Sequence, residues 1–398
     1  MSPAHSPIDA RALGSAALAG ASTAAHAAAR RWLDAWVEAQ FQPRAWTWAD
    51  SGTTALTWAL EAALGPRQPR AVALPGYACY DLATACDGAK ATAVLYDLDP
   101  ATLGPDWGSL QRALAAGVSA VVAVHLFGLP VDMRRIRELA SAHGAIVIED
   151  AAQGVGATYD GRPVGTHGAL SVLSFGRGKG LTAGGGGLVL ANDEAFAASI
   201  GRRSPVAHGG WAALGKSIAQ SLLSSPGRYW LPASLPMLGL GETIYHPVRS
   251  GGGLSRVGTG LLSRTVALAG EALPGRRRLA GIWQAGLSVG WAGLVPCPAS
   301  GGVPGYLRFP ILLPRTAGEG GALVRRLARH GVGRGYPLPL ARLPGFTRGV
   351  VPPGERLEGA GWLAESLLTL PTHVHVQQRD IDAVLEGLHS LSPRPAAG

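Results

Sequence analysis

The 398-residue chain has few cysteines and little charge. Its three cysteines, Cys79, Cys86 and Cys297, are an odd number spread along the chain, which excludes a disulfide scaffold and a clustered zinc site. We therefore expect no metal ion and a reducing, cytoplasmic location. Charged residues make up only 15% of the sequence, whereas glycine (57) and proline (29) are abundant, and this balance favours a compact, loop-rich protein over a helical bundle or coiled coil.

A long uninterrupted apolar run is also missing. The most hydrophobic stretch, 211–240, contains Lys216 and Arg228 and is broken by prolines, so it cannot provide the ~20 continuous apolar residues of a transmembrane span. Its tryptophans and leucines fit either a subunit interface or a membrane surface. The Ala-rich N-terminus lacks the apolar core of a secretory signal, and we expect residues 1–45 to form a helical arm before the main domain.

Acidic residues are outnumbered, which gives a formal net charge of +9. The basic residues are scattered apart from the short run Arg276–Arg278, so we expect no nucleic-acid partner. A positive field around a cleft would instead attract an anionic substrate, and a phosphate cofactor or a nucleotide sugar both fit that description.

Residues 50–200 alternate between short apolar runs and helical patterns, which is typical of the α/β class with a mainly parallel sheet flanked by helices. The length suggests two or three domains. We expect a large α/β domain over 46–250 and a smaller α+β domain over 251–398, while 200–275 give no clear course. The expected strands are 71–74, 91–96, 120–124, 145–148, 170–174 and 187–190, and the expected helices are 50–64, 80–87 and 132–143; the smaller domain adds a strand at 306–313 and helices at 317–330 and 380–391.

A glycine-containing turn precedes the first of these helices. Ser51, Gly52, Thr53 and Thr54 lead into an apolar helical pattern that ends at Leu64. Free backbone amides and the positive end of the helix dipole make such a start a binding site for a phosphate. The same residues also fit a simple helix cap, so the turn alone leaves both interpretations open.

An aspartate follows directly on an apolar strand. Asp150 lies within Glu149-Asp-Ala-Ala-Gln153, and ligand sites in parallel sheets lie at the carboxyl ends of strands. A carboxylate in a partly dry site can keep a heteroaromatic nitrogen protonated, because the ion pair favours the charged form. An aspartate at a strand end equally often caps the next helix.

A lysine follows the next expected strand. The segment from Ser174 to Lys179 also contains Arg177, and a run of four glycines, 184–187, comes soon after it. A lysine in a pocket beside another cation can have its pKa lowered enough to form a Schiff base. The alternative for Lys179 is a solvated surface residue, as most lysines are.

Taken in order, these segments are the parts that a pyridoxal phosphate site requires. The sequence resembles the DegT/DnrJ-type nucleotide-sugar aminotransferases, a branch of the fold-type I pyridoxal phosphate enzymes, from about residue 51 to 193 and more faintly to the C-terminus. The matching segments are Ser51 to Thr54, His125 with Phe127 and Gly128, Glu149 to Gln153, and Ser174, Phe175 and Lys179. The resemblance implies that Gly52, Thr53, Thr54 and Ser174 hold the phosphate, Asp150 pairs with the pyridine nitrogen, Gln153 lies beside the ring and Lys179 forms the Schiff base.

The sequence departs from the family pattern at several positions. Gly176 stands where the family usually has histidine, and the run 184–187 replaces Gly-Glu-Gly-Gly. The family often has an aromatic residue near the position of Cys79, so we expect Tyr80 or Tyr77 to stack on the ring. The asparagine that a neighbouring subunit usually lends to the phosphate has no clear counterpart, and it belongs near residues 245–256.

The resemblance implies a homodimeric aminotransferase with glutamate as amino donor and a nucleotide-linked keto sugar as acceptor, acting in glycan or exopolysaccharide biosynthesis. Relatives that dehydrate sugars replace the lysine with histidine, so Lys179 favours transamination. Another fold-type I reaction stays open. So does a non-catalytic protein that binds the cofactor or a sugar nucleotide. In the second half, Arg308, Arg334, His373 and His375 fit either substrate anions or a surface role.

Overall fold

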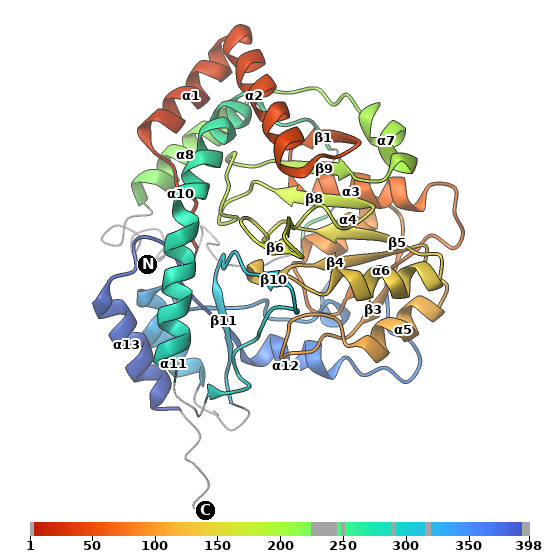
Figure 1. Cartoon of the computed structure of the whole chain (residues 1–398), viewed down its shortest axis with the longest axis vertical. Coiled ribbons are helices and arrows are strands. Elements are labelled where there is room, and N and C mark those ends of the chain that lie inside the picture. Colours follow the sequence, from red (N-terminus) through yellow and green to blue (C-terminus); the bar gives the residue numbers. More distant parts are fainter. Residues whose placement is uncertain (1–3, 224–244, 248–250, 288–290, 315–319, 392–398) are drawn as a thin grey trace, which may run out of the picture.

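The computed structural model describes residues 4–223, 245–247, 251–287, 291–314 and 320–391. The centre of this part of the chain is an eight-stranded sheet in the order β1-β9-β8-β5-β4-β2-β3-β13 (Figure 1). The strands from β8 to β13 pair in parallel, whereas β9 runs against both of its neighbours. The bounds are β1 Ala45–Ala49, β2 Ala71–Pro75, β3 Thr92–Tyr96, β4 Ala120–Val124, β5 Ile146–Asp150, β8 Leu170–Ser174, β9 Gly187–Ala191 and β13 Gly349–Val350.

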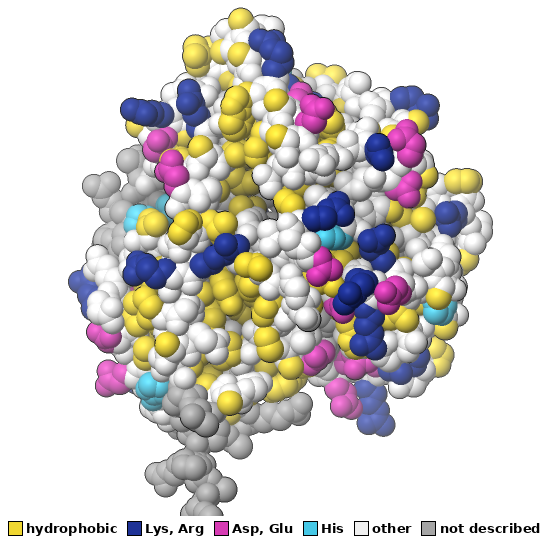
Figure 2. Space-filling model, in the orientation of Figure 1, with side chains coloured by type: hydrophobic (Ala, Val, Ile, Leu, Met, Phe, Trp, Pro, Cys, Tyr) yellow, Lys and Arg dark blue, Asp and Glu magenta, His cyan; other side chains and the backbone are white. Residues whose placement is uncertain are grey.

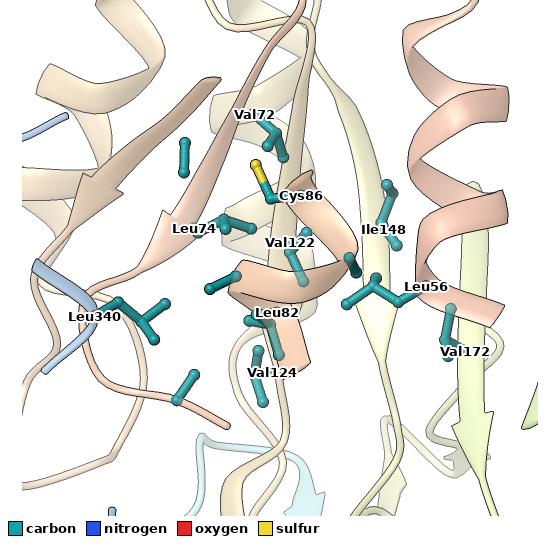
Figure 3. Close-up of a cluster of buried hydrophobic side chains, with 14 of the residues drawn as sticks. Leu56, Val72, Leu74, Leu82, Cys86, Val122, Val124, Ile148, Val172 and Leu340 are labelled. Carbon is teal, nitrogen blue, oxygen red and sulfur yellow. The ribbon is translucent and has the colours of Figure 1, made fainter. Parts of the chain in front are cut away.

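Helices cover both faces of this sheet, which explains why its strands are continuous apolar runs. In β2, Val72 and Leu74 belong to one core cluster while Ala71 and Ala73 belong to the other, because successive residues of a strand face opposite sides. Figure 3 shows the first cluster, between the sheet and its covering helices. That face is covered by α3 (Gly52–Leu64), α4 (Asp81–Gly88) and α12 (Glu358–Ser366), and the other by α2 (Thr23–Phe41), α5 (Trp107–Ala115) and α6 (Met133–Ala142).

The 31-residue helix α10 (Arg256–Gly286) connects the N-terminal helices to a second, smaller sheet. Its first half packs against α1 (Ala10–Ala21) so closely that a Cβ on Gly260 would lie 2.4 Å from the carbonyl oxygen of Ser15. Its second half packs through Leu279 and Trp283 on the sheet of order β11-β14-β12. The elements of this smaller unit are β11 Phe309–Leu312, β12 Gly333–Arg334, β14 Leu367–Leu370, α11 Gly320–Leu327 and α13 Gln378–His389.

The remaining helices and strands are short. Helix α7 (Glu194–Gly201) packs on β1 and β9, and α8 (Trp211–Leu223) packs on α1 and α10. A separate three-stranded sheet has the order β10-β6-β7. Its bounds are β6 Thr158–Tyr159, β7 Arg162–Pro163 and β10 Gly302–Val303.

Most of the expected elements are confirmed. The six expected strands are β2, β3, β4, β5, β8 and β9, and the helical arm consists of α1 and α2. The sequence did not predict β1, α5 or α7, and the unassigned stretch 200–275 contains α8 and most of α10. β13 belongs to the large sheet although it lies in 251–398, because its two residues pair with β3.

Two expectations concern the surface. None of the helices described is both long and apolar enough to span a bilayer. Residues 224–240 of the tryptophan-rich stretch lie outside the described residues. On the face in Figure 2, lysine and arginine side chains lie in separate groups and do not form one continuous stripe.

Candidate active site

A pocket opens at the edge of the sheet where three neighbouring parallel strands end. β4 ends at Val124, β5 at Asp150 and β8 at Ser174, and all three residues line the pocket, as expected for the carboxyl ends of parallel strands. It encloses about 430 Å³ of space, its open mouth included. Its apolar lining consists of Leu56, Leu82, Val124 and Val172, which also belong to the core cluster drawn in Figure 3. Its polar lining comes from Gly52, Thr53, Asp81, Asp150, Gln153, Ser174 and Lys179.

Helix α3 begins at this pocket and presents backbone amides to it. Ser51 Oγ accepts a hydrogen bond from the Thr54 amide at 3.1 Å and donates one to the Thr54 hydroxyl at 2.9 Å. The amides of Gly52 and Thr53 precede the first helical hydrogen bond and stay available as donors. A Cβ on Gly52 would lie 2.7 Å from Ser174 Oγ, so glycine is what lets the helix start meet that hydroxyl.

The residues of the turn divide between the pocket and the helix cap. Ser51 caps the helix, while Gly52 and Thr53 line the pocket. The expected phosphate contact of Thr54 is not placed in the pocket lining, because Ser51 bonds both its polar groups and its methyl group faces Gly251.

Asp150 lines the same pocket as a buried carboxylate. Only 6% of its surface is exposed, and its Oδ1 accepts a hydrogen bond from the Ala152 amide at 2.9 Å. Burial raises the pKa of Asp150, and the Ala152 amide and the positive charge of Lys179 oppose that rise. A cationic group in the pocket would complete the pairing that the buried carboxylate lacks.

Glu149, one residue before Asp150, is held by a dense set of donors. Its carboxylate is fully buried and accepts hydrogen bonds from His125 Nε2 at 2.9 Å and from the amide of Gly165 at 2.6 Å. The amides of His167 and Gly168 donate to its other oxygen at 2.7 and 3.0 Å. Burial alone would raise the pKa of Glu149, but the His125 and Gly165 hydrogen bonds outweigh it and lower the pKa to about 2.

This arrangement fixes the backbone that carries Asp150. His125 Nδ1 accepts a hydrogen bond from the Val131 amide at 3.2 Å, so its proton lies on Nε2, which donates to Glu149. The His125 amide in turn donates to the carbonyl of Asp150. His125 and Glu149 both belong to the motifs that resemble the family pattern. In the structure, both hold the end of β5 in place.

Lys179 lies in a glycine-flanked turn after β8 and lines the pocket. Gly178 and Gly180 have φ of +75° and +85°, a region that favours glycine, so the turn brings the lysine back to the strand end. The Gly178 amide donates to Ser6 Oγ at 3.2 Å, so the N-terminal segment packs on the outside of the turn. Burial raises the pKa of both Asp150 and Cys79, and the positive charge of Lys179 opposes that rise in each case.

Gln153 connects the pocket to the smaller unit. Its Oε1 accepts a hydrogen bond from the Phe127 amide at 3.0 Å, and its Nε2 donates to the hydroxyl of Tyr336 at 2.8 Å. The Tyr336 ring lies in a group of aromatic rings with Phe127 and Tyr77. The orientation of Gln153 at the pocket is thus set from both sides.

The hydroxyls of the two tyrosines expected to stack on a cofactor ring bind the smaller unit. The Tyr77 hydroxyl accepts from the Tyr336 amide, and the Tyr80 hydroxyl accepts from the Leu338 amide, each at 2.8 Å. Neither tyrosine is part of the pocket lining, whereas Cys79 is. Burial raises the pKa of the Cys79 thiol to about 12, so it faces the pocket as a neutral group.

Other expected residues fall outside the pocket. Arg308 and Arg334 do not line it, and residues 248–250 of the stretch around Tyr245 lie outside the described residues. Asp81 and the four residues of the apolar lining were not predicted. Asp81 is the first residue of α4, and only its position after a strand could have suggested it.

The donor set fits pyridoxal phosphate. The pocket combines a lysine amine, a buried carboxylate and a helix start with a serine hydroxyl beside it. These are, in turn, partners for an aldehyde, a protonated ring nitrogen and a phosphate. Burial raises the pKa of Asp150, and a pyridinium nitrogen beside it would favour the charged carboxylate.

The sequence profile of the DegT/DnrJ/EryC1/StrS aminotransferase family matches residues 45–209, which include the whole pocket lining. L-glutamine:2-deoxy-scyllo-inosose aminotransferase of Streptomyces kanamyceticus is 39% identical over 149 residues, or 37% of this chain and 35% of that protein. GDP-perosamine synthase of Caulobacter vibrioides is 39% identical over 152 residues, or 38% of this chain and 40% of that protein. The aligned stretch thus spans less than half the length of these curated relatives.

The likeness in structure extends over the whole chain. A sugar aminotransferase from Micromonospora echinospora has a TM-score of 0.73 to this structure and covers 97% of this chain and 98% of its own, at 22% identity. This confirms the expected fold, a large mixed and mainly parallel sheet flanked by helices together with a smaller α+β unit. The resemblance inferred from the motifs is confirmed as well.

Proposed function

Because residues 45–209 are a DegT/DnrJ/EryC1/StrS aminotransferase segment, we propose that the chain is a pyridoxal-phosphate-dependent aminotransferase acting on a keto sugar. The observation that carries this proposal is that Lys179 and Asp150 line one pocket together with the start of α3. The chain has three lysines, and the other two, Lys90 and Lys216, are exposed and do not line the pocket.

Each end of the pocket has one task. The amides of Gly52 and Thr53 and the hydroxyl of Ser174 would bind the phosphate at the positive end of the α3 dipole. Asp150 would hold a proton on the ring nitrogen, which lets the bound cofactor act as an electron sink for transamination. The hydrogen bonds that Glu149 accepts would hold the end of β5, and with it Asp150, in place when a positively charged ring nitrogen binds.

Lys179 would bind the cofactor covalently and, once the amino donor displaces it, move a proton at Nζ between substrate carbon and cofactor carbon. General acid–base catalysis by a positioned amine contributes roughly 100- to 10,000-fold. The neighbouring glycines leave the lysine room to swing between these two positions. Gln153, held by Phe127 and Tyr336, would fix the ring from the side.

The finer assignment is glutamate as donor, a nucleotide-linked keto sugar as acceptor, and a cytoplasmic homodimer that serves glycan or exopolysaccharide biosynthesis. All three cysteines are free thiols, which supports a reducing compartment. Exposed apolar side chains on neighbouring helices, Leu18 on α1 and Trp211 on α8, support a subunit contact.

The experiment is the visible absorbance of purified protein loaded with pyridoxal phosphate, as wild type, Lys179→Ala and Lys216→Ala. We expect a yellow band in wild type and Lys216→Ala, absent from Lys179→Ala, and lost when excess glutamate is added. Glutamine is tested in parallel, since the Streptomyces relative is named for that donor. A wild-type protein that shows no band after loading would overturn the proposal.

A second variant tests the role of the carboxylate. Asp150→Asn keeps the shape of the side chain but cannot hold a proton on the ring nitrogen, so the rate at which glutamate removes the band falls by roughly 100-fold or more. Stopped-flow absorbance measures that rate. An unchanged rate in a fully loaded variant would remove Asp150 from the mechanism.

A further inference from the structure

The pocket contains one charged residue to which the proposed function gives no task. Asp81, Asp150 and Lys179 are the charged residues of its lining as the structure describes it, and the last two are assigned to the cofactor. Asp81 is the first residue of α4 and is exposed, whereas Asp150 is buried. Asp81 therefore lies at the outer part of the lining, on the side from which a substrate enters.

The charge of Asp81 is not neutralised by a neighbouring side chain. Within the described part of the chain, its carboxylate accepts no hydrogen bond and forms no ion pair. Burial is the main cause of the raised pKa of Cys79 and of Asp150, and the negative charge of Asp81 adds to the rise in both. The charge of Asp81 is therefore felt inside the pocket although the residue itself is exposed.

Binding of the cofactor would leave Asp81 as the charge that faces the substrate. Under the proposed function, the amine of Lys179 is used in a covalent bond and Asp150 is paired with a protonated ring nitrogen. The other polar side chains of the lining are neutral: Thr53, Gln153, Ser174 and the thiol of Cys79. No arginine belongs to the described lining, so a carboxylate on a substrate would find no basic partner there.

We propose that Asp81 is a specificity-determining residue that disfavours an amino donor with a second carboxylate. Glutamate and glutamine have the same length and share the amino group and the carboxylate beside it, so they differ only in the charge of the side-chain end. The like charge of Asp81 repels glutamate, whereas the amide of glutamine can donate a hydrogen bond to the same carboxylate. At equal concentration, glutamine therefore reacts faster than glutamate.

The inference rests on the proposed function and deepens one part of it, the selection of the amino donor. It concerns the relative rates of two donors at the same site, which are a property of the pocket. Which donor the enzyme uses in a cell depends in addition on the concentrations of both, so the charge of Asp81 is compatible with glutamate as the donor there.

The experiment measures the second-order rate constant for loss of the visible band from loaded protein, once with glutamate and once with glutamine. Asp81→Asn removes the charge and keeps the shape of the side chain, so we expect the glutamate rate to rise by about 3- to 10-fold relative to the glutamine rate. Asp382→Asn, an exposed change on α13 outside the pocket lining, alters the net charge equally and leaves the ratio unchanged.

Two further measurements separate the charge of Asp81 from its shape. Asp81→Glu keeps the charge, so we expect it to retain the wild-type preference within about 2-fold. Salt screens the repulsion, so raising the ionic strength from about 0.01 M to about 1 M should increase the glutamate rate relative to the glutamine rate in wild type and not in Asp81→Asn. Asp81→Ala replaces Asp81→Asn in both comparisons if the latter does not load the cofactor.

Two results would overturn the inference while the proposed function stands. The first is a ratio of the two rates that Asp81→Asn leaves unchanged. The second is a wild-type preference that Asp81→Glu abolishes or that salt does not alter, because the charge is then not its cause. A wild-type band that neither glutamate nor glutamine removes would instead overturn the proposed function, and this inference with it. The two failures are therefore distinguishable from the same absorbance traces.

Discussion

The chain buries two charges in different ways, Glu149 below the pocket and Arg276 behind the turn of Lys179. Glu149 has no exposed surface and accepts hydrogen bonds from five donors, His125, Gly165, His167, Gly168 and Ser171. Arg276 is almost as deeply buried, and its Nη1 has no partner among the described residues. The chain itself surrounds the first charge with hydrogen-bond donors, whereas Nη1 of the second has no acceptor among the described residues.

The difference lies in the partners that surround each charge. A buried ion is tolerated when every lone pair or proton has a partner, and the loop 165–168 supplies those partners for Glu149. Glycine at position 168 lets this loop pack closely on the strand of Glu149, because a Cβ there would lie 2.9 Å from the Glu149 amide nitrogen. A buried charge left without partners costs stability.

The largest effect is expected from removing the satisfied charge. Glu149→Ala leaves three backbone amides and the His125 ring without an acceptor, so the free energy of unfolding falls by about 3–5 kcal/mol. Urea unfolding followed by circular dichroism measures it. Glu138→Ala, an exposed change on α6, is the control and stays within about 0.5 kcal/mol of wild type. If the free energy of unfolding of Glu149→Ala fell no further than that of this control, the structural role of Glu149 would be contradicted.

Acid tests the same carboxylate without changing its shape. The pKa of Glu149 is lowered from 4.5 to about 2, so the stability that it contributes is complete above pH 4.5 and is lost as the pH falls toward 2. The shift corresponds to about 3 kcal/mol. We therefore expect the stability of Glu149→Gln, which cannot titrate there, to fall less steeply with acid than that of wild type. Parallel curves for the two proteins would contradict the assignment.

Loss of the neutral hydrogen bond between Gln153 and Tyr336 should have an effect of intermediate size on stability. Tyr336→Phe removes the hydroxyl that accepts from Gln153 Nε2 and leaves that amide group without its partner, at a cost of about 1–2 kcal/mol in unfolding free energy. Because Gln153 lines the pocket, the affinity for the cofactor should weaken as well, which titration of the visible band measures. Unchanged stability together with unchanged affinity would show that Phe127 alone fixes Gln153.

The smallest effect on stability is expected at the unsatisfied charge. Arg276→Met removes a buried charge that has no partner at Nη1, so the free energy of unfolding without ligand changes by less than about 1 kcal/mol or rises. The same urea measurement applies. A loss of about 3 kcal/mol or more would mean that Arg276 has a protein partner after all, and the contrast with Glu149 would disappear.

Local pattern was enough to predict the centre of the fold. Strands β2, β4 and β8 are apolar runs buried on both faces, and such runs are visible in sequence without knowledge of their neighbours. β1 was missed because its burial depends on pairing with β9, more than 130 residues later. β13 was missed because two exposed residues carry no pattern, and only their pairing with β3 makes them a strand.

The residues predicted for the pocket also divide into those whose place the sequence indicates and those whose place depends on distant partners. Gly52, Asp150, Ser174 and Lys179 sit at element ends that the sequence marks, and the structure brings them together. Tyr80 and Thr54 are not among the residues that line the pocket. The hydrogen bonds that hold them could not be predicted from sequence, because Tyr80 binds Leu338 far along the chain and Thr54 binds Ser51 across a turn. The contact of His5 with His373 and His375 could not be predicted for the same reason, because it joins residue 5 to residue 375.

The most direct test of the central claim is to find which lysine carries the cofactor. Wild-type protein loaded with pyridoxal phosphate is reduced with sodium borohydride, which makes the bond between lysine and cofactor permanent, and its peptides are then weighed by mass spectrometry. The account predicts one modified site, on the peptide that contains Lys179, with Lys90 and Lys216 unmodified. Modification of Lys90 or Lys216 in place of Lys179, or of no lysine at all, would contradict it.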